Sequence, residues 1–260
     1  KKVKNIYGDI LNIRFLRKKI NEHRPEIIFH LAAQSLVIEG YKNPYKTFLD
    51  NSNGVLNILE IVRKTNFVKS LIIATSDKCY KIKKKKIFKE NDELGGLDPY
   101  SSSKAAAEII FNSYLNLKFR NKVGLATVRA GNVIGGGDFS KNRLIPDCFR
   151  SMKTKKIILR NPKAIRPWQH VMDVCRGYLI LSKKIYLKPR LFSGSWNFGP
   201  KKNDLNVLNL ARFFKKLSSK KFKIKIVNNN KFKETTILKL NSQKSEKKLK
   251  WKNLINSKLM

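Results

Sequence analysis

Cysteine, acidic residues and long apolar runs are all scarce in this 260-residue sequence. Its three cysteines, Cys79, Cys148 and Cys175, are odd in number and far apart, which fits neither a disulfide framework nor a zinc knuckle. No apolar run approaches the roughly 20 residues that a helix needs to cross a bilayer. The opening KKVKNIYGDI has neither the apolar segment nor the cleavage site of a signal peptide. We therefore expect a cytoplasmic protein without a membrane partner.

The scarcity of acidic residues leaves the chain very basic. There are 57 Lys and Arg against 18 Asp and Glu, for a net charge of +39. Such an excess is typical of nucleic-acid-binding proteins. The lysines, however, extend over the whole chain, and the densest basic run, residues 81–89, contains no array of aromatic residues on which bases could stack. We expect weak, salt-sensitive binding to polyanions and no specific nucleic-acid partner, with a non-catalytic polyanion-binding protein as the alternative.

Apolar segments and amphipathic segments alternate along the first two hundred residues. The strand-like segments are KNIY, EIIFHLAA, SLIIATS, VGLATVRAGNVI and SWNFGP, and helix-like segments separate most of them. Continuous apolar strands joined by helices are typical of a parallel sheet that is covered on both faces. The sequence therefore predicts an α/β fold with a doubly wound parallel sheet.

Polar side chains follow one of these strands directly. Ser76, Asp77 and Lys78 come after the apolar run SLIIA, and three adjacent polar groups at a buried strand end are costly unless they are used. An Asp with a raised pKa can act as a general acid, and a Lys with a lowered pKa can act as a base. The alternative is an ordinary exit from strand to loop. Because the carboxyl ends of parallel strands share one edge, HLAAQ, TSDKCY and RAGNV should lie together there.

A tyrosine and a lysine four residues apart open the helix SSSKAAAEI. On a helix, Tyr100 and Lys104 would share one face. An ammonium about 4 Å from the phenol, at an effective dielectric of about 20, would lower the tyrosine pKa from about 10 by roughly 3 units. That shift would make Tyr100 a general base near neutral pH. By itself the spacing is weak evidence, since surface residues often show it by chance.

Taken in order, the motifs resemble those of the extended short-chain dehydrogenases/reductases, in particular the CDP-glucose 4,6-dehydratase branch. The resemblance rests on HLAAQ, NPYKTFLDNSNGVLNILE, ATSDKCY, ENDELGGLDPYSSSKAAAE, RAGNVIGGGDF, RLIPD, RNPKAIRPWQHVMDV and WNFGP. It implies a Rossmann-type sheet, NAD as the cofactor and CDP-glucose as the substrate. It also implies oxidation at C4, elimination of water across C5 and C6, and return of the hydride to C6. Another nucleotide-sugar dehydratase or an epimerase of the same family is the alternative.

The resemblance assigns catalytic roles residue by residue. Tyr100 takes the proton of the C4 hydroxyl, while Lys104 lowers its pKa and binds the nicotinamide ribose. Ser76 orients the sugar at C4, and Asp77 protonates the departing C6 hydroxyl. Lys78 stands where many relatives have a Glu that removes the C5 proton, and Ser-Asp-Lys is the form associated with the CDP-glucose branch.

Binding roles follow in the same way. The residues implied along the cofactor are Asp9, Ile10, Ala32, Ala33, Gln34 and Asn51, together with Tyr100 and Lys104. Those implied on the substrate side are Asn132, Arg143, Arg166, His170 and Asn197, of which Arg143 and His170 are the weaker candidates. Arg166 is physically apt, because a guanidinium matches phosphate oxygens. His170 is as well explained as a structural histidine.

The sequence departs from this family in one respect. It has no G-x-x-G-x-x-G loop of the kind that holds the pyrophosphate, and GGGD at 135–138 has different spacing. We therefore expect a fragment that lacks the first half-unit of the sheet and binds NAD poorly. The expected dinucleotide-binding domain comprises residues 1–131 and 168–200, and the nucleotide-sugar-binding lobe comprises 132–167 and 201–260. A homodimer through the helices around 52–64 and 103–118 is also expected.

Overall fold

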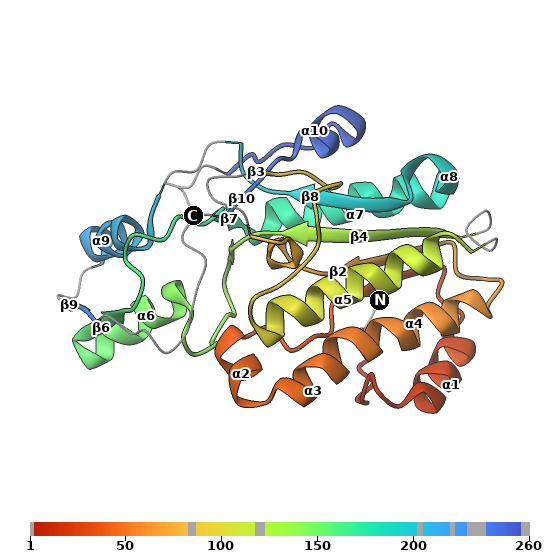
Figure 1. The fold of residues 1–260 in the computed structure, drawn as a ribbon, viewed down its shortest axis with the longest axis horizontal. Helices are drawn as coiled ribbons and strands as arrows, with labels where there is room; N and C mark the ends of the chain where they lie inside the picture. The colour runs from red at the N-terminus through yellow and green to blue at the C-terminus, as the bar shows by residue number, and fades with distance from the viewer. Residues whose placement is uncertain are drawn as a thin grey trace.

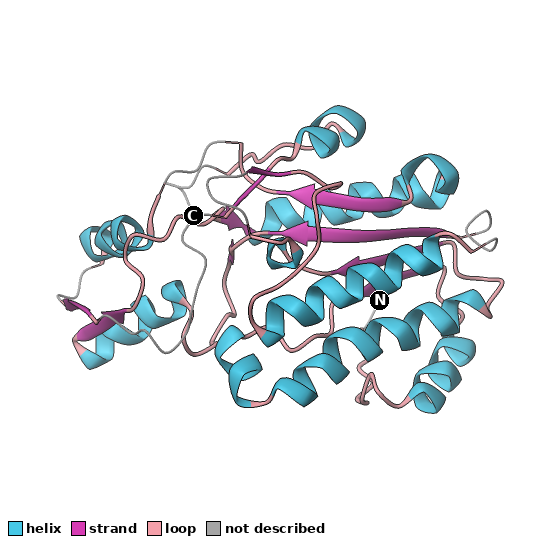
Figure 2. Cartoon of the chain, viewed as in Figure 1, coloured by secondary structure: helices cyan, strands magenta, loops and turns pink. Residues whose placement is uncertain are grey.

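The structure is a computed structural model that describes residues 3–82, 87–117, 123–201, 205–218, 222–227 and 238–255. Part of the basic run, residues 83–86, therefore lies outside the described residues. The helices are α1 (Ile13–His23), α2 (Val37–Lys42), α3 (Pro44–Phe48), α4 (Gly54–Arg63), α5 (Pro99–Leu115), α6 (Leu144–Thr154), α7 (Val171–Leu187), α8 (Pro189–Phe192), α9 (Val207–Leu217) and α10 (Gln243–Leu249). The strands are β1 (Ile27–His30), β2 (Ser70–Ala74), β3 (Ile87–Phe88), β4 (Gly124–Ala130), β5 (Val133–Ile134), β6 (Lys156–Leu159), β7 (Gln169–His170), β8 (Gly194–Phe198), β9 (Lys223–Ile226) and β10 (Lys239–Leu240). Figure 2 shows their distribution.

Four parallel strands form the central sheet in the order β1-β2-β4-β8. The chain passes from one strand to the next through helices, as parallel pairing requires. The predicted α/β fold with a parallel sheet is thereby confirmed, and all four strands overlap segments that the apolar runs had indicated. The arrowheads of β2, β4 and β8 point toward the same end of the molecule in Figure 1.

Alternate side chains of the strands enter two separate cores. Leu71, Ile73 and Leu125 pack with α4 and α5 on one face. Ile72 and Val128 point the other way and pack with α7, Trp196, Phe198 and the C-terminal Trp251. A strand whose side chains are buried on both faces is mostly apolar, which explains the near-continuous apolar runs in the sequence. Figure 1 shows α4 and α5 on one side of the sheet and α7 on the other.

A smaller lobe lies beyond the carboxyl ends of the sheet strands (Figure 1). It consists of α6, α9 and the parallel pair β6-β9, around its own apolar cluster of Cys148, Ile157, Leu159, Ala211 and Phe222. This lobe draws on residues from both of the predicted lobe ranges, 132–167 and 201–260. Leu249 and Trp251, which also fall within the range 201–260, pack against the sheet instead of the lobe.

One predicted strand is wrong. Residues 4–7, KNIY, form no strand, and Val3 and Tyr7 are 87% and 89% exposed. An apolar strand needs a ladder partner and a buried face, and this segment has neither among the described residues. It leads instead into the turn before α1, where the side chain of Asn12 accepts a hydrogen bond from the backbone of Phe15.

Within the described ranges, none of the helices is both long and apolar enough to cross a membrane.

Candidate active site

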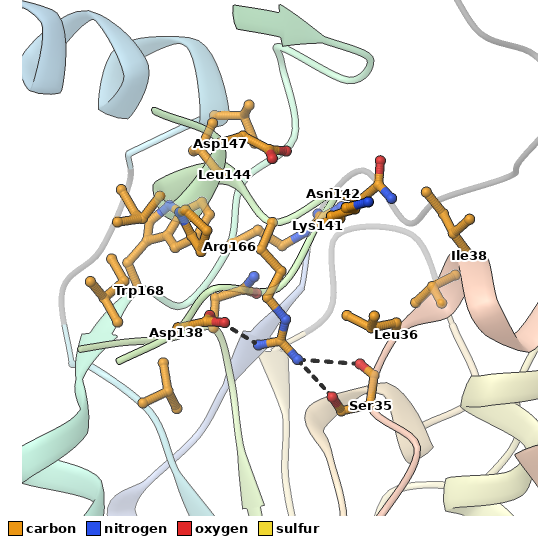
Figure 3. A pocket seen from close by; sticks show the side chains of 18 of the residues that line it. Ser35, Leu36, Ile38, Asp138, Lys141, Asn142, Leu144, Asp147, Arg166 and Trp168 are labelled. Carbon is orange, nitrogen blue, oxygen red and sulfur yellow. Dashed lines mark hydrogen bonds and ion pairs between the residues drawn. The ribbon is translucent and has the colours of Figure 1, made fainter. Parts of the chain in front are cut away.

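A cavity of about 1000 Å³ opens between the carboxyl edge of the sheet and the small lobe. Its sheet side is lined by residues that include Thr75, Ser76, Asp77, Lys78 and Tyr100. Its lobe side is lined by residues that include Asn132, Asp138, Arg143, Arg166 and Trp168. Figure 3 shows Arg166, Trp168 and Asp138 facing Ser35 and Leu36 across this space. The structure thus brings together segments that are more than a hundred residues apart in the sequence, such as those of Ser35 and Trp168.

The segment Ser76–Lys78 begins where β2 has ended and turns at once into a short 3₁₀ helix, Asp77–Cys79. The Ser76 hydroxyl accepts a hydrogen bond from the backbone N–H of Lys78 at 3.1 Å and donates one to Asp77 Oδ1 at 3.0 Å. This cap explains why a serine stands at the turn. It also places the hydroxyl, the carboxyl and the ammonium of three consecutive residues on the cavity wall.

Asp77 is buried, and within the described part of the chain its Oδ2 has no hydrogen-bond partner. Burial raises the pKa of this carboxyl to about 6, against the opposing effects of Lys78, the Ser76 hydrogen bond and Arg166. Such a group holds a proton close to neutral pH and can release it to a departing hydroxyl. The predicted role of general acid therefore has a physical basis in the structure.

Tyr100 and Lys104 lie in the first two turns of α5, whose N-terminus is capped by Asp98. Both side chains are buried, at 7% and 4% exposure. Burial raises the pKa of Tyr100 to about 12, and the hydrogen bond with Ser76 acts in the opposite direction. The predicted lowering of the Tyr100 pKa by Lys104 is therefore wrong for this structure.

The position of the Lys104 ammonium explains the difference. Its Nζ donates a hydrogen bond to the carbonyl oxygen of Ala74, at 3.3 Å, at the end of β2. Burial lowers the pKa of Lys104 to about 8, and the neighbouring Glu108 carboxylate opposes this shift. Burial disfavours a phenolate and an ammonium alike, and neither group shifts the pKa of the other appreciably.

Of the residues predicted on the cofactor side, Tyr100 lines the cavity, whereas the others do not. Asn51 stands in a π-helical turn, Leu49–Asn53, and its Nδ2 donates to the Gln34 carbonyl at 3.0 Å and to Ser103 Oγ at 2.9 Å. π-Helical turns are frequent at functional sites. Asn51 Oδ1 is buried, and no described residue donates a hydrogen bond to it. The structure thus joins Asn51 and Gln34 in one network.

The other predicted cofactor residues flank this network. Ala32 is exposed and Ala33 half-buried in the loop after β1. The Ile10 carbonyl accepts a hydrogen bond from Asn57 Nδ2 at 3.0 Å, which holds the loop of Asp9 and Ile10 against α4. The roles of these four residues stay predictions.

On the substrate side, Arg166 is 5% exposed and lines the cavity together with Asn132. Arg143 is more open. Its Nη2 donates to the backbone oxygen and the hydroxyl of Ser35, at 3.3 and 3.1 Å, and its guanidinium lies 4.0 Å from Asp138. Figure 3 shows these contacts as dashed lines that cross between the lobe and the loop of Ser35. Arg143 therefore links the two walls of the cavity.

Two predicted substrate residues do not line the cavity. Asn197 is fully buried in β8, where its Nδ2 donates to the Phe88 and Asn241 carbonyls and its Oδ1 accepts from Tyr80. His170 caps α7, its Nδ1 accepting a hydrogen bond from the Met172 backbone. The geometry supports structural roles for both side chains, because their polar atoms already bind neighbouring segments.

The sequence reading missed a buried ion pair beneath the site. Glu108 and Arg129 form two hydrogen bonds, Nε to Oε1 at 2.9 Å and Nη2 to Oε2 at 2.7 Å, and both side chains are at most 1% exposed. Burial by itself would raise the pKa of Glu108, but the Arg129 guanidinium and hydrogen bonds from Thr75 and Thr127 hold it below its usual value. One sequence signal was present, since Glu108 follows Lys104 by one helical turn.

Comparison with known proteins identifies the family. The family model described as GDP-mannose 4,6 dehydratase matches residues 1–259. The chain belongs to this family. A CDP-glucose 4,6-dehydratase of Salmonella typhimurium is 44% identical over 205 residues, which are 76% of this chain and 57% of that protein. The chain thus spans little more than half the length of this relative.

More distant family members are also similar. A bifunctional UDP-glucose 4-epimerase and UDP-xylose 4-epimerase of Pisum sativum is 25% identical over 263 residues, covering 94% of this chain and 74% of that protein. Among solved structures, a dTDP-glucose 4,6-dehydratase of Bacillus anthracis in complex with NAD has a TM-score of 0.80 at 24% identity, covering 98% and 76% of the two chains. MoeE5 in complex with UDP-glucose and NAD has a TM-score of 0.86 at 17% identity, covering 97% and 81%. These two similarities show that the chain has a Rossmann-like α/β fold with a parallel sheet.

Proposed function

We propose that the protein dehydrates a nucleotide-activated hexose to its 4-keto-6-deoxy form, with CDP-glucose as the substrate. The observation that carries the proposal is Asp77, a buried carboxyl with a pKa near 6 on the wall of the cavity, within the same short segment as Ser76 and Lys78. A dehydration needs an acid to protonate the departing hydroxyl, and a 4-epimerisation does not. The 44% identity with a protein named CDP-glucose 4,6-dehydratase supports the same substrate class.

The residues of the cavity can divide the proton transfers among them. Tyr100, hydrogen-bonded to Ser76, would take the proton of the C4 hydroxyl, and Ser76 would orient that hydroxyl. Asp77 would give its proton to the C6 hydroxyl as it leaves as water. Lys78 is the nearest amine to this carboxyl in sequence and would take the C5 proton. Arg166 and Arg143 would bind the diphosphate, since both guanidinium groups line the cavity.

NAD is the proposed cofactor, and bound NAD would supply a hydride acceptor and donor. Residues of this structure fit its nicotinamide end. The buried Asn51 Oδ1 offers an acceptor that no described residue uses, and the small side chains of Ala32 and Ala33 leave the backbone after β1 accessible. The Lys104 ammonium, which donates to the Ala74 carbonyl at the end of β2, would hold the ribose. The neighbouring loop of Asp9 and Ile10 is the proposed place of the adenine.

The direct test incubates the natural protein with CDP-glucose and NAD and follows the keto sugar by its absorbance in alkali, without added reductant. We expect a 4-keto-6-deoxy product from CDP-glucose and less from UDP-, dTDP- or GDP-hexoses. The Asp77→Asn variant should reduce kcat by about 100-fold or more, the range typical of a lost general acid. Formation of no keto sugar from any of these substrates would contradict the proposal.

The same variant separates the dehydratase from the second candidate, a nucleotide-sugar 4-epimerase, which the Pisum sativum relative suggests. An epimerase uses the tyrosine and needs no acid at C6. Asp77→Asn should therefore leave the interconversion of a hexose and its C4 epimer largely intact. Tyr100→Phe should abolish both reactions and serves as the matched control.

We further propose that the protein is a cytoplasmic homodimer. Each subunit would comprise a dinucleotide-binding domain, residues 1–131 and 168–200, and a nucleotide-sugar-binding lobe, residues 132–167 and 201–260. The exposed faces of α4 and α5 carry apolar side chains, such as Leu56 and Ile109 at 38% and 60% exposure, and these suit a helix-to-helix contact between subunits. The three cysteines are free thiols, as expected for a reducing compartment. Sedimentation equilibrium of the natural protein would contradict the dimer if it gave the monomer mass at micromolar concentration.

A further inference from the structure

The Glu108–Arg129 ion pair lies beneath the segment that carries the proposed acid, and neither side chain lines the cavity. Both groups are buried and hydrogen-bonded to each other twice. A pair that does not line the cavity is not placed to take part in the chemistry directly. Its influence on the reaction has to pass through the groups that it holds.

One of these groups is Thr75, the residue directly before Ser76. Its hydroxyl donates a hydrogen bond to Glu108 Oε1 at 2.5 Å, and its backbone N–H donates to the Val128 carbonyl at 3.0 Å. Ser76 itself has an extended backbone from which the 3₁₀ turn begins. Fixing Thr75 therefore fixes the direction in which the reactive segment leaves the sheet.

The other group is Tyr80, at the far end of the same segment. Arg129 Nη1 donates to the Tyr80 hydroxyl at 2.8 Å, and the guanidinium lies 4.9 Å from the centre of the tyrosine ring. The hydroxyl in turn donates to Asn197 Oδ1 at 2.7 Å, which anchors the tyrosine to β8. One ion pair thus holds both ends of the segment 76–79.

We propose that Glu108 and Arg129 are positioning residues for the proposed dehydration, acting through Thr75 and Tyr80 to hold Ser76, Asp77 and Lys78 in the geometry that the reaction needs. The proposal rests on the proposed function. Its physical basis is that a displacement of about 1 Å in a reacting group can cost as much as 100-fold in rate. A catalytic group is held to that precision only when its neighbours are themselves fixed by packing and hydrogen bonds.

Two threonines provide a matched test. Thr75 and Thr127 both donate to the Glu108 carboxylate, at 2.5 Å to Oε1 and 2.9 Å to Oε2. Thr127, however, lies inside β4, opposite Ile73, and is not joined in sequence to the reactive segment. Each Thr→Val substitution removes one hydroxyl and leaves the ion pair in place. In the natural protein, Thr75→Val should lower kcat by about 10- to 100-fold with KM changed less than about twofold. Thr127→Val should retain the wild-type kcat, and Thr75→Ser should restore it.

Hydrogen exchange of the backbone amides gives a readout that does not depend on turnover. Amides of residues 76–80 should exchange faster in Thr75→Val than in Thr127→Val, and Tyr80→Phe should have the same effect from the other end. Equal kcat and equal exchange in the two valine variants would overturn the proposal. If the wild-type protein forms no keto sugar, the proposed function fails, and the exchange comparison alone then decides whether the ion pair orders this segment.

Discussion

Asp77 and Glu108 are both buried carboxyl groups close to the carboxyl edge of the sheet, yet their surroundings differ. Glu108 accepts five hydrogen bonds, from Thr75, Thr127, Ser195 and twice from Arg129. Asp77 has one oxygen bonded to Ser76 and another with no partner among the residues that the structure describes. The pKa of Glu108 is lowered, whereas that of Asp77 is raised to about 6.

This difference shows how burial can be used in two ways. A carboxylate with a full set of donors and a counter-charge stays ionised and ties segments together. A buried carboxyl without such donors and counter-charge keeps its proton. It then contributes little to holding segments together but can act as a general acid. The two groups are linked through Thr75 and Ser76, so that the structural carboxylate supports the reactive one. The following predictions test that division of roles.

The largest effect is expected from neutralising the structural carboxylate. Glu108→Gln leaves the buried Arg129 guanidinium without its counter-charge, which should lower the free energy of unfolding by about 3–5 kcal/mol. Urea denaturation followed by circular dichroism measures this loss. A double variant, Glu108→Leu with Arg129→Met, is the control, because it removes both charges and should be more stable than the single variant. A loss below about 1 kcal/mol in Glu108→Gln would contradict the structural role.

A smaller effect is expected from Asp77, and it should depend on pH. Its folded-state pKa of about 6 lies above the ordinary 3.8, so its contribution to stability is full below pH 3.8 and is lost as the pH rises through 6. Asp77→Asn, which resembles the protonated acid, should gain about 2–3 kcal/mol relative to wild type between pH 4 and pH 7. The free energy of unfolding of both proteins, measured across this range, tests it.

The two carboxyl groups should be distinguishable in that experiment. The lowered pKa of Glu108 gives a contribution that is present at neutral pH and lost on acidification, the reverse of Asp77. A constant difference between Asp77→Asn and wild type from pH 4 to pH 7 would mean that Asp77 ionises like an exposed carboxyl, and the proposed acid would lose its physical basis.

The smallest effect is expected where an ion pair is exposed. Lys81 and Glu93 approach to 2.5 Å, but their side chains are 58% and 49% exposed. Water and salt screen such a pair, so Glu93→Gln should change the free energy of unfolding by less than about 0.5 kcal/mol. The same urea experiment measures this change. A loss comparable to that of Glu108→Gln would show that burial does not set the strength of these ion pairs.

Much of the site could be predicted from the sequence because its residues are adjacent or at helical spacing. Ser76, Asp77 and Lys78 line the cavity as one segment, and Tyr100 joins them from the start of α5. Asn197 and His170 were harder, because a polar residue near a strand end can face substrate or a neighbouring strand. Which of the two it faces depends on the neighbouring segments. In this fold the Asn197 amide donates to Phe88 in β3 and to Asn241, which follows β10.

The sequence by itself determined the parallel sheet, since continuous apolar strands have to be buried on both faces, and it determined the order of the polar segments at the sheet edge. The tertiary structure alone decided the charge states there. The pKa of a side chain depends on the water that it loses and on the charges that it meets, and both are set by segments distant in sequence. The Lys104 ammonium, for example, donates to the Ala74 carbonyl at the end of β2, and Glu108 meets Arg129 from another strand.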